Sequence, residues 1–345
     1  MRNLVQEDVH VWVASLAPAE QEHDLSELHA LLDEEERARA ARFLFERHRR
    51  QFILSHALVR RALSEYAPVI PEAWRFHANA HRRPEVENAA GASLCFSLSH
   101  TDGLALCAVT LSAEVGVDVE LERPYADDRL SLARALLHPR EVAALEATAP
   151  ADVCARFLEL WTLKEAYVKA RGLGLSLSFR DFAFTTGSGR APEIHFDPGL
   201  EDSRSGWRFF QLRPTELHRG ALAVRRAGHE ALRVTQIFVD LLNAQARGCA
   251  TLIEPYPRRG RASAAGFGIQ TRAGARRQRC SSAWSRSSRT WWNGWRASRV
   301  DGVQISQMLS AKSIDAATLR SRRPHLARPQ KRWPCFAPCS AGRAR

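Results

Sequence analysis

The chain of 345 residues is 45% hydrophobic and carries 50 Lys plus Arg against 38 Asp plus Glu, a formal net charge of +12. Taken as a total, this charge favours nucleic acid or a membrane surface as a partner. The charge is uneven, however: residues 1–240 hold 29 basic and 35 acidic side chains, and residues 241–345 hold 21 and 3. The positive excess therefore belongs to the tail and not to a folded site in front of it.

The sequence shows no feature of a membrane or secreted protein. No apolar run reaches the ~20 residues that a membrane span needs, and the start of the chain lacks the basic-then-apolar layout of a signal peptide. No CxxC pair with matching His or Cys partners occurs, which argues against a zinc site and a disulfide framework. We expect a cytoplasmic monomer without membrane contact.

In chain order, the hydrophobic pattern predicts helices and strands in two successive groups. The first group begins with helix over residues 33–66, in two pieces, which Pro68 and Pro71 terminate. Asp102-Gly103 between two apolar runs predicts a hairpin. Strands are expected next over residues 74–77, 93–99, 104–111 and 115–121, the last of them just past the boundary between the two groups. The second group has helices over residues 129–137 and 153–171 and strands over residues 182–185, 207–212, 221–225 and 232–239.

These groups predict an α+β fold of two similar lobes, residues 1–113 and 114–243. After about residue 243 the pattern ends, because Arg, Ser, Ala and Gly dominate and five of the nine Trp occur without periodicity. Such a segment has few means to offset the entropy of ordering. We expect residues 244–345 to form a basic, disordered tail, typical of sequence that was never selected for folding.

The segment Gly116–Glu120 carries two acidic residues, Asp118 and Glu120, that alternate with valines. On a strand these two side chains share one face, about 7 Å apart at Cα from a rise of ~3.3 Å per residue. Such a pair suits a divalent cation with oxygen ligands. The alternative is a surface strand whose outer face is acidic.

A second motif, Trp161–Leu175, begins in the predicted long helix. Glu165 and Lys169 stand four residues apart on one stripe of that helix, and Gly172 and Gly174 follow closely. Glu165 would add a third carboxylate to the strand pair, which with water and phosphate describes a magnesium site for phosphate chemistry. The alternative is an exposed Glu–Lys pair that stabilises the helix by a few tenths of a kcal/mol.

Three further groups could bind an anion: Arg47, Arg49 and Arg50 before an apolar helix, the turn His81–Pro84, and Ser97–Thr101 at the end of an apolar strand. A solvated helix face would explain the first group, and a polar turn the second. The third group places hydroxyls and an imidazole, Ser99 and His100, where a phosphate could be held. A Ser–His nucleophile pair is a weaker alternative, because no G-x-S-x-G elbow accompanies it.

Together and in this order, these segments resemble the Sfp-type 4′-phosphopantetheinyl transferases, which activate acyl and peptidyl carrier proteins. The similarity runs from about His48 to Asp240, and the tail has no counterpart in the family. The segments that carry it are GVDVE at Gly116–Glu120, WTLKEAYVKARGLGL at Trp161–Leu175, FSLSH at Phe96–His100, HRRP at His81–Pro84 and LVR at Leu58–Arg60.

The resemblance implies a pseudo-dimer of two α+β lobes with coenzyme A in the cleft between them. It implies that Asp118, Glu120 and Glu165 ligate Mg²⁺, which holds the pyrophosphate of coenzyme A. The implied coenzyme A contacts are Ser99, His100 and Lys169 at the phosphates, Arg83 by the adenine, and Arg50 or its neighbours Arg47 and Arg49 at the 3′-phosphate.

The implied reaction moves the phosphopantetheine arm from coenzyme A to a serine of a carrier protein and releases adenosine 3′,5′-bisphosphate. Glu165 would act as the base for the serine hydroxyl, and Lys169 would stabilise or protonate the leaving phosphate. Partner carriers are expected to show an acidic helix beside the serine. Whether they serve fatty-acid, polyketide or nonribosomal-peptide synthesis stays open.

Two other functions are consistent with parts of the sequence. An acidic strand pair with a distant Glu and Lys also suits a metal-dependent nuclease, with the basic tail as a nucleic-acid arm. A non-enzymatic module could bind nucleic acid through the tail alone, by release of counterions. The net acidic charge of residues 1–240 argues against the nuclease.

Overall fold

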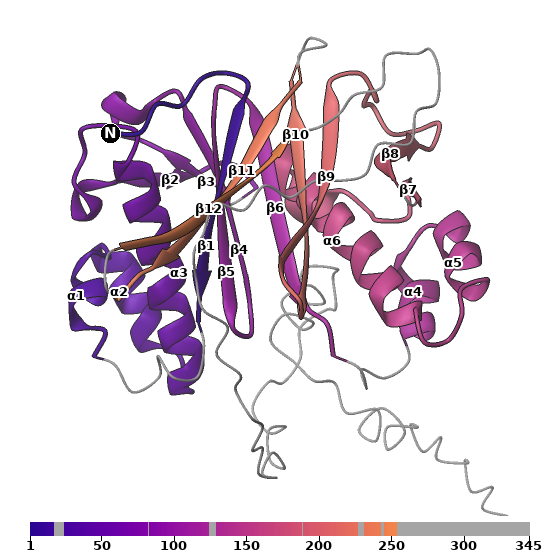
Figure 1. Ribbon diagram of the computed structural model, residues 1–345, viewed down its shortest axis with the longest axis horizontal. Coiled ribbons are helices and arrows are strands. Elements are labelled where there is room, and N and C mark those ends of the chain that lie inside the picture. Colours follow the sequence, from indigo (N-terminus) through magenta and orange to yellow (C-terminus); the bar gives the residue numbers. More distant parts are fainter. Residues whose placement is uncertain are drawn as a thin grey trace, which may run out of the picture. The chain divides into compact units, whose positions relative to one another are not determined.

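The computed structural model describes residues 1–16, 24–81, 83–123, 129–187, 189–226, 231–242 and 245–253, which form a mixed α+β structure (Figure 1). The helices are α1 (Ser26–Ala30), α2 (Glu34–Ala41), α3 (Glu46–Ser64), α4 (Arg129–Leu136), α5 (Pro139–Glu146) and α6 (Val153–Arg171), with 3-10 turns at Pro71–Ala73, Ala89–Gly91 and Gly174–Ser176. The strands are β1 (Asp8–Ser15), β2 (Phe76–Ala78), β3 (Pro84–Val86), β4 (Leu94–Thr101), β5 (Leu104–Leu111), β6 (Glu114–Leu121), β7 (Phe182–Gly187), β8 (Arg190–Phe196), β9 (Trp207–Thr215), β10 (His218–Arg225), β11 (Arg233–Asp240) and β12 (Gln245–Ile253).

The first sheet has the strand order β12-β11-β1-β5-β4. Strand β11 runs parallel to β1, with Trp12 opposite Ile237, and the other neighbours are antiparallel. The chain therefore leaves this sheet after β5 and returns to it with β11. Helices α1–α3 lie on one side of the sheet (Figure 1), where Leu58 and Leu63 of α3 join Trp12 in one buried core.

The second sheet has the order β6-β10-β9, all antiparallel. Helix α6 packs on this sheet, and Phe157 and Tyr167 of that helix share a core with Phe209 of β9. Helices α4 and α5 pack against α6, and β7 and β8 form a separate hairpin. Each large sheet thus carries one helix of 19 residues, α3 on the first and α6 on the second.

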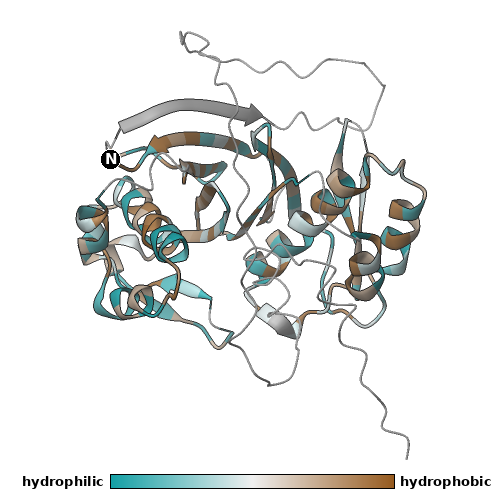
Figure 2. Cartoon of the chain, turned by 90° about the horizontal axis from the view of Figure 1, so that it is seen from below, coloured by the Kyte–Doolittle hydropathy of each residue, from teal (hydrophilic) through white to brown (hydrophobic). Residues whose placement is uncertain are grey.

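A third core lies between the two sheets. Val9 and Val11 of β1 pack there with Val117 of β6 and Leu222 of β10, all fully buried. Because helices cover the opposite face of the first sheet, its inner strand β5 is buried on both faces and is a nearly continuous apolar run. Figure 2 shows the complementary pattern in the flanking helices, which carry hydrophobic residues on one side and hydrophilic residues on the other.

Strands β4 and β6 lie side by side where the two sheets meet. Side chains join them, because the Val117 N–H donates to Ser97 Oγ at 3.1 Å and Ser99 Oγ donates to Asp118 Oδ1 at 2.8 Å. Polar side chains of β4 therefore cover the acidic side of β6. This junction positions the candidate site.

The structure confirms the predicted α+β class and the hairpin at Asp102-Gly103, where Gly103 has φ of 85° between β4 and β5. Two segments differ from the prediction, one in the sheet that it joins and one in its secondary structure. Strand β11, expected in the second lobe, pairs with β1, and residues 245–253, expected in the disordered tail, form β12. The rest of the expected tail lies outside the described residues. Among the described residues, none of the helices has the length and apolarity to cross a membrane.

Candidate active site

Three carboxylates and one lysine gather where β4, β6 and α6 meet, and we call Asp118, Glu120, Glu165 and Lys169 the carboxylate centre. Lys169 Nζ lies 2.6 Å from Asp118 Oδ1, and Glu120 Oε2 accepts from Thr101 Oγ1 at 3.3 Å. Asp118 and Glu120 share one face of β6, as the alternation predicted. The face is not a solvated surface, since the two residues are only 4% and 8% exposed.

Gly116 determines how closely β6 approaches α6. A Cβ atom on this residue would lie 2.0 Å from the Ala166 carbonyl oxygen and 2.4 Å from the Ala170 nitrogen. Any side chain here would push the strand away from the helix. The glycine therefore lets the acidic pair of β6 reach the Glu–Lys pair of α6.

Buried charges of the same sign set the protonation of this centre. Loss of solvent, together with the carboxylates of Asp118 and Glu165, raises the pKa of Glu120 to about 8, although Lys169 acts in the opposite direction. Burial lowers the pKa of Lys169, but Asp118 and Glu165 outweigh burial and raise it. Lys169 is therefore positively charged at neutral pH. The centre holds more carboxylates than this one ammonium group can neutralise.

Lys169 and Ser99 connect the centre to the strands around it. Lys169 Nζ donates to Ser99 Oγ at 2.9 Å and to the Val117 carbonyl oxygen at 3.2 Å, besides its contact with Asp118. The other carboxylate oxygen of Asp118, Oδ2, is buried and has no partner among the described residues. A buried carboxylate oxygen without a donor is costly in a folded protein. It is therefore a position where a bound cation or donor would be stabilised.

His100 follows Ser99 on β4 and faces the same space. Burial, and then the positive charges of Lys169, His56 and Arg39, lower the pKa of His100 to about 4. Its Nδ1 is closed to solvent and has no hydrogen-bond partner within the described part of the chain. The ring is therefore neutral at pH 7 and offers one N–H and one lone pair.

A cavity of about 830 Å³ opens over the carboxylate centre. All the site residues predicted from the sequence line it except Arg50 and its alternatives Arg47 and Arg49. One side of the cavity comes from α2 and α3 and includes Arg39, His48, Gln51, Phe52 and His56; the other includes the largely apolar Ala135, Leu136, Trp161, Val168, Leu177 and Phe179. The residues on the α2 and α3 side were missed in the sequence, because a helix rich in Arg and His has the composition of a solvated face.

The predicted arginine ligands have different surroundings. Arg83 lines the cavity, but its guanidinium donates to the carbonyl oxygens of Ala170, at 2.6 Å, and Val115, at 3.3 Å. It therefore fixes the C-terminal end of α6 to β6. Arg50 lines a separate cleft of about 270 Å³ beside α1, and its neighbour Arg49 pairs with Glu46 at 2.9 Å.

A buried ion pair behind the cavity holds α6 in place. Lys164 is fully buried and contacts Glu141 Oε2 at 2.9 Å and the carbonyl oxygens of Phe179 and Phe182 at 2.7 and 2.5 Å. Burial lowers the pKa of Lys164 to about 8, against the opposing effect of Glu141. Because Lys164 directly precedes Glu165, this pair fixes the part of the helix that supplies the third carboxylate.

The oxygen atoms of the carboxylate centre fit a divalent cation in part. Among the described residues, no group of three His, Cys, Asp or Glu side chains is arranged to hold a metal ion. The unpartnered Oδ2 of Asp118 and the raised pKa of Glu120 nevertheless fit a bound cation, and carboxylate oxygens are ligands that Mg²⁺ prefers. Lys169 holds Oδ1 of Asp118, so a cation would bind through the remaining oxygens.

Comparison with known proteins agrees with this arrangement. Residues 17–112 match the family model described as 4′-phosphopantetheinyl transferase, N-terminal, and residues 114–225 match that of the 4′-phosphopantetheinyl transferase superfamily. The 4′-phosphopantetheinyl transferase HetI of Nostoc sp. is 33% identical over 227 residues, which are 65% of this chain and 91% of that protein. The chain belongs to the 4′-phosphopantetheinyl transferase superfamily. The resemblance seen in the sequence is thereby confirmed, and the protein is a transferase of this family.

Other members of the superfamily align over shorter stretches. A 4′-phosphopantetheinyl transferase of Bacillus subtilis is 27% identical over 45% of this chain and 66% of its own length. The 4′-phosphopantetheinyl transferase AcpT of Salmonella typhimurium is 43% identical over 24% of this chain and 43% of its own length. A solved holo-ACP synthase of Plasmodium yoelii aligns with 34% of this chain at 17% identity and a TM-score of 0.28, too slight a likeness to bear on the fold.

Proposed function

We propose that this protein transfers the 4′-phosphopantetheine arm from coenzyme A to a serine of an acyl or peptidyl carrier protein, in a Mg²⁺-dependent reaction that releases adenosine 3′,5′-bisphosphate. The observation that carries the proposal is the carboxylate centre at the base of a cavity of about 830 Å³. This volume lies in the upper part of the range of small-molecule sites. A long, polyanionic donor fits a space that offers both cations and apolar walls.

Asp118, Glu120 and Glu165 would hold the Mg²⁺ ion, which when bound would neutralise charge on the diphosphate of coenzyme A. The protein's own hydrogen-bond donors, one cation and one neutral imidazole, act on the same group. Lys169 reaches the centre from α6 and His100 from β4, so both can donate to phosphate oxygens. Ser99 holds the Lys169 ammonium from the other side at 2.9 Å.

Glu165 is the base that the reaction requires. A serine hydroxyl is a weak nucleophile at neutral pH and must give up its proton as it attacks phosphorus. Its oxygen forms a bond to the phosphorus that carries the pantetheine arm, the bond from that phosphorus to the adenosine bisphosphate oxygen breaks, and the serine proton passes to the Glu165 carboxylate. Lys169 stabilises or protonates the leaving phosphate. The base for the serine hydroxyl, Glu165, and the donor to the leaving phosphate, Lys169, are thus one helical turn apart on α6.

Intact-mass measurement of a carrier protein tests the proposal. The wild-type protein, coenzyme A, Mg²⁺ and an apo carrier from fatty-acid, polyketide or nonribosomal-peptide synthesis should give a carrier heavier by the mass of the arm. Asp118→Asn should abolish that gain. Glu114→Gln is the matched control, because Glu114 lies on the same strand, outside the cavity, and pairs with Arg225 at 3.4 Å. Absence of a mass gain with every carrier class would refute the proposed function.

A further inference from the structure

The hairpin of β2 and β3 connects the core of the first sheet to the long helix on the second sheet. At its base, Phe76 and Val86 pack against the first core, and the ring centroids of Phe76 and Phe96 lie 5.3 Å apart. At its turn, the Arg83 guanidinium donates to the carbonyl oxygen of Ala170 in α6 at 2.6 Å. The hairpin is therefore fixed at one end to the first sheet and at the other end to α6.

The two terminal nitrogens of Arg83 hold two elements at once. Nη1 donates to the Ala170 carbonyl oxygen, in the last turn of α6, and Nη2 donates to the Val115 carbonyl oxygen, near the start of β6, at 3.3 Å. The last four carbonyls of a helix have no partner within it, and a cation is favoured at that end. A planar guanidinium can span two acceptors, which a lysine ammonium does not reproduce. We call these two contacts the Arg83 clamp.

The clamp lies where β6 and α6 come closest. Gly116 follows Val115, and a Cβ atom on it would lie 2.4 Å from the Ala170 nitrogen. Gly172, directly after α6, has φ of 63°, and a Cβ atom there would lie 3.0 Å from Arg83 Cδ. One glycine thus makes room for the strand against the helix, and the other makes room for the arginine.

The backbone that carries Arg83 is fixed within the hairpin itself. Asn79 Oδ1 accepts from the N–H groups of His81 and Arg83 at 2.9 and 3.0 Å, and Asn79 Nδ2 donates to Glu85 Oε1 at 3.2 Å. The Asn79 N–H also donates to the Arg83 carbonyl oxygen at 2.9 Å. A side chain on a backbone that is already ordered loses less conformational entropy when it makes a contact. The turn is therefore built to present Arg83.

The other end of β6 is held to α6 by a different arginine. Arg219 of β10 contacts Glu122, just after β6, at 2.7 Å and Glu159, in the second turn of α6, at 2.9 Å. The start of β6 thus lies by the end of α6, and the end of β6 lies by the start of α6. The carboxylate centre is between the two arginines, with Asp118 and Lys169 toward the Arg83 clamp.

The clamp is adjacent in the chain to the groups that would act on phosphate. Lys169 directly precedes Ala170, and Asp118 lies three residues after Val115. Lys169 Nζ and Asp118 Oδ1 are 2.6 Å apart. A movement of the helix end relative to the strand therefore displaces the ammonium group from the carboxylates. A displacement of about 1 Å in a reacting geometry can cost about 100-fold in rate.

We propose that Arg83 is a positioning residue that acts through Lys169: it holds the end of α6 against the start of β6 and so places the ammonium group at the leaving phosphate. The proposal rests on the function proposed above. It differs from the role that the sequence resemblance implied, in which Arg83 lies by the adenine of coenzyme A. A contact with adenine contributes equally to the bound donor and the transition state and appears in KM, whereas a misplaced Lys169 lowers kcat.

Steady-state kinetics and calorimetry with coenzyme A separate the two roles. Arg83→Ala should lower kcat by about 10- to 100-fold and leave the Kd for coenzyme A within about threefold of the wild type. Arg83→Lys should give a kcat between those two proteins, because it keeps the charge without the fork that spans both carbonyls. A raised Kd with an unchanged kcat in Arg83→Ala would overturn the proposal in favour of a donor contact, and no change in either would overturn both.

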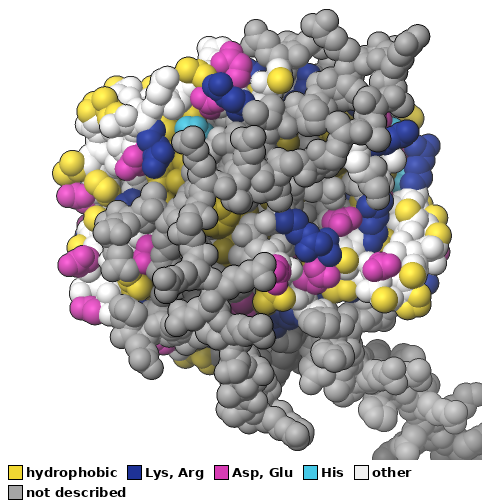
Figure 3. Space-filling view, viewed as in Figure 1, with side chains coloured by type: hydrophobic (Ala, Val, Ile, Leu, Met, Phe, Trp, Pro, Cys, Tyr) yellow, Lys and Arg dark blue, Asp and Glu magenta, His cyan; other side chains and the backbone are white. Residues whose placement is uncertain are grey.

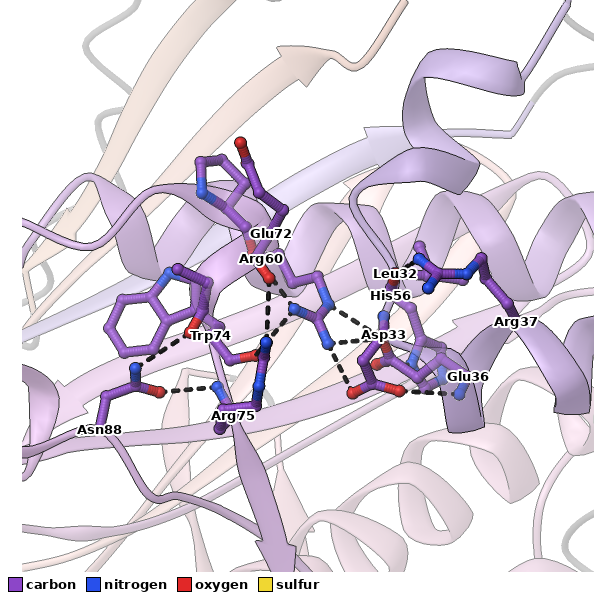
Figure 4. Close-up of polar contacts among 12 residues, drawn as sticks. Leu32, Asp33, Glu36, Arg37, His56, Arg60, Glu72, Trp74, Arg75 and Asn88 are labelled. Carbon is purple, nitrogen blue, oxygen red and sulfur yellow. Dashed lines mark hydrogen bonds and ion pairs between the residues drawn. The ribbon is translucent and has the colours of Figure 1, made fainter.

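Arg75 provides the matched control. Its guanidinium also donates to two carbonyl oxygens, those of Glu72 and Trp74, both at 3.0 Å (Figure 4). These contacts lie within one short segment, and Arg75 is exposed and does not line the cavity. Arg75→Ala should therefore change neither kcat nor Kd. Asn79→Ala, which keeps the Arg83 side chain but frees its turn, should lower kcat in the same direction as Arg83→Ala by a smaller factor.

Amide hydrogen exchange tests the clamp without turnover. The Gly172 N–H donates to the carbonyl oxygens of Val168 and Lys169 at the end of α6. Arg83→Ala should speed exchange over residues 168–172 and leave exchange around Glu159, which Arg219 holds, at the wild-type rate. If the wild type transfers no arm, the proposed function fails while this comparison still decides whether Arg83 holds α6. Equal exchange over residues 168–172 in variant and wild type would contradict the clamp.

Discussion

Two charged clusters near the cavity, the carboxylate centre and the Arg60 cluster (Arg60, Asp33, Glu36 and His56), differ in how completely their charges are paired. In the Arg60 cluster, the guanidinium contacts two carboxylates and two carbonyl oxygens, and the pKa of Glu36 falls to about 2. In the carboxylate centre, Asp118 Oδ2 has no partner among the described residues, and the pKa of Glu120 rises to about 8. Asp118 and Glu120 of one cluster and Arg60 of the other are all buried, so burial alone does not separate structure from function. The pairing of the charges separates them, because the carboxylate centre has more carboxylates than cations and leaves Asp118 Oδ2 without a partner among the described residues.

The largest expected loss of activity comes from a substitution in the carboxylate centre. Glu165→Gln should lower kcat/KM for arm transfer by at least about 100-fold, because it removes the base and one carboxylate. The free energy of unfolding should not fall, since one of several like charges is removed from a buried site. Kinetics and urea unfolding on the same preparation measure both quantities. A loss of stability that accounts for the loss of activity would make Glu165 a structural residue.

A substitution in the Arg60 cluster should instead lower the free energy of unfolding. Arg60→Met leaves two partly buried carboxylates without their buried cation, so the free energy of unfolding should fall by about 3 kcal/mol, the low end for a buried ion pair. The control is Arg49→Met, because Arg49 is half-exposed and pairs with Glu46 on the surface, where such a pair contributes at most about 1 kcal/mol. Urea unfolding compares the two. Similar small losses for both variants would mean that the Arg60 cluster does not hold α2 and α3 together.

The sequence predicted the shared face of Asp118 and Glu120, because strict alternation with valines has only one geometry on a strand. It did not predict that this face is buried, since the cover comes from β4, and no local pattern reports which strand lies alongside. Strand β1 was missed although Val9, Val11 and Val13 alternate. Its partner β11 lies more than two hundred residues later, and that pairing is set by the tertiary fold.

The candidate site was predictable where residues are adjacent in the chain and unpredictable where helices meet. Gly116 and Lys169 belong to contiguous motifs: Lys169 is part of the carboxylate centre, and Gly116 lets β6 approach α6. His56 gave no such signal, because its place on the cavity wall depends on Glu36 in another helix and on packing that only the folded structure forms. The total charge was equally uninformative for the folded part. On the face in Figure 3, basic and acidic side chains are interspersed among the described residues.

The pH dependence of stability sharpens the comparison of the two clusters. The pKa of Glu120 is raised from 4.5 to about 8, so between these values the folded protein binds a proton that the unfolded chain releases. Without a divalent cation, the contribution of Glu120 to the free energy of unfolding is therefore present below pH 4.5 and lost as the pH rises through 8. Glu120→Gln should flatten this decline in urea unfolding. An identical pH profile for variant and wild type would show that Glu120 titrates normally.

The smallest effect is expected at the edge of the carboxylate centre. Ser99→Ala removes one hydroxyl that donates to Asp118 and accepts from Lys169, so kcat/KM should fall by about 3- to 10-fold, the value of one ordinary hydrogen bond. Lys169 keeps its contacts with Asp118 and the Val117 carbonyl oxygen and stays in place. Transfer kinetics measure the change. A loss as large as that of Glu165→Gln would make Ser99 a participant in the chemistry.

The role of the carboxylate centre is tested most directly by the metal dependence of arm transfer. Wild-type protein freed of divalent cations with a chelator, then supplied with coenzyme A and an apo carrier, should leave the mass of the carrier unchanged. Addition of Mg²⁺ in excess of the chelator should restore the gain, and Asp118→Asn should not regain it at the same Mg²⁺ concentration. Full transfer by the wild type in excess chelator would contradict the assignment of these carboxylates to a metal.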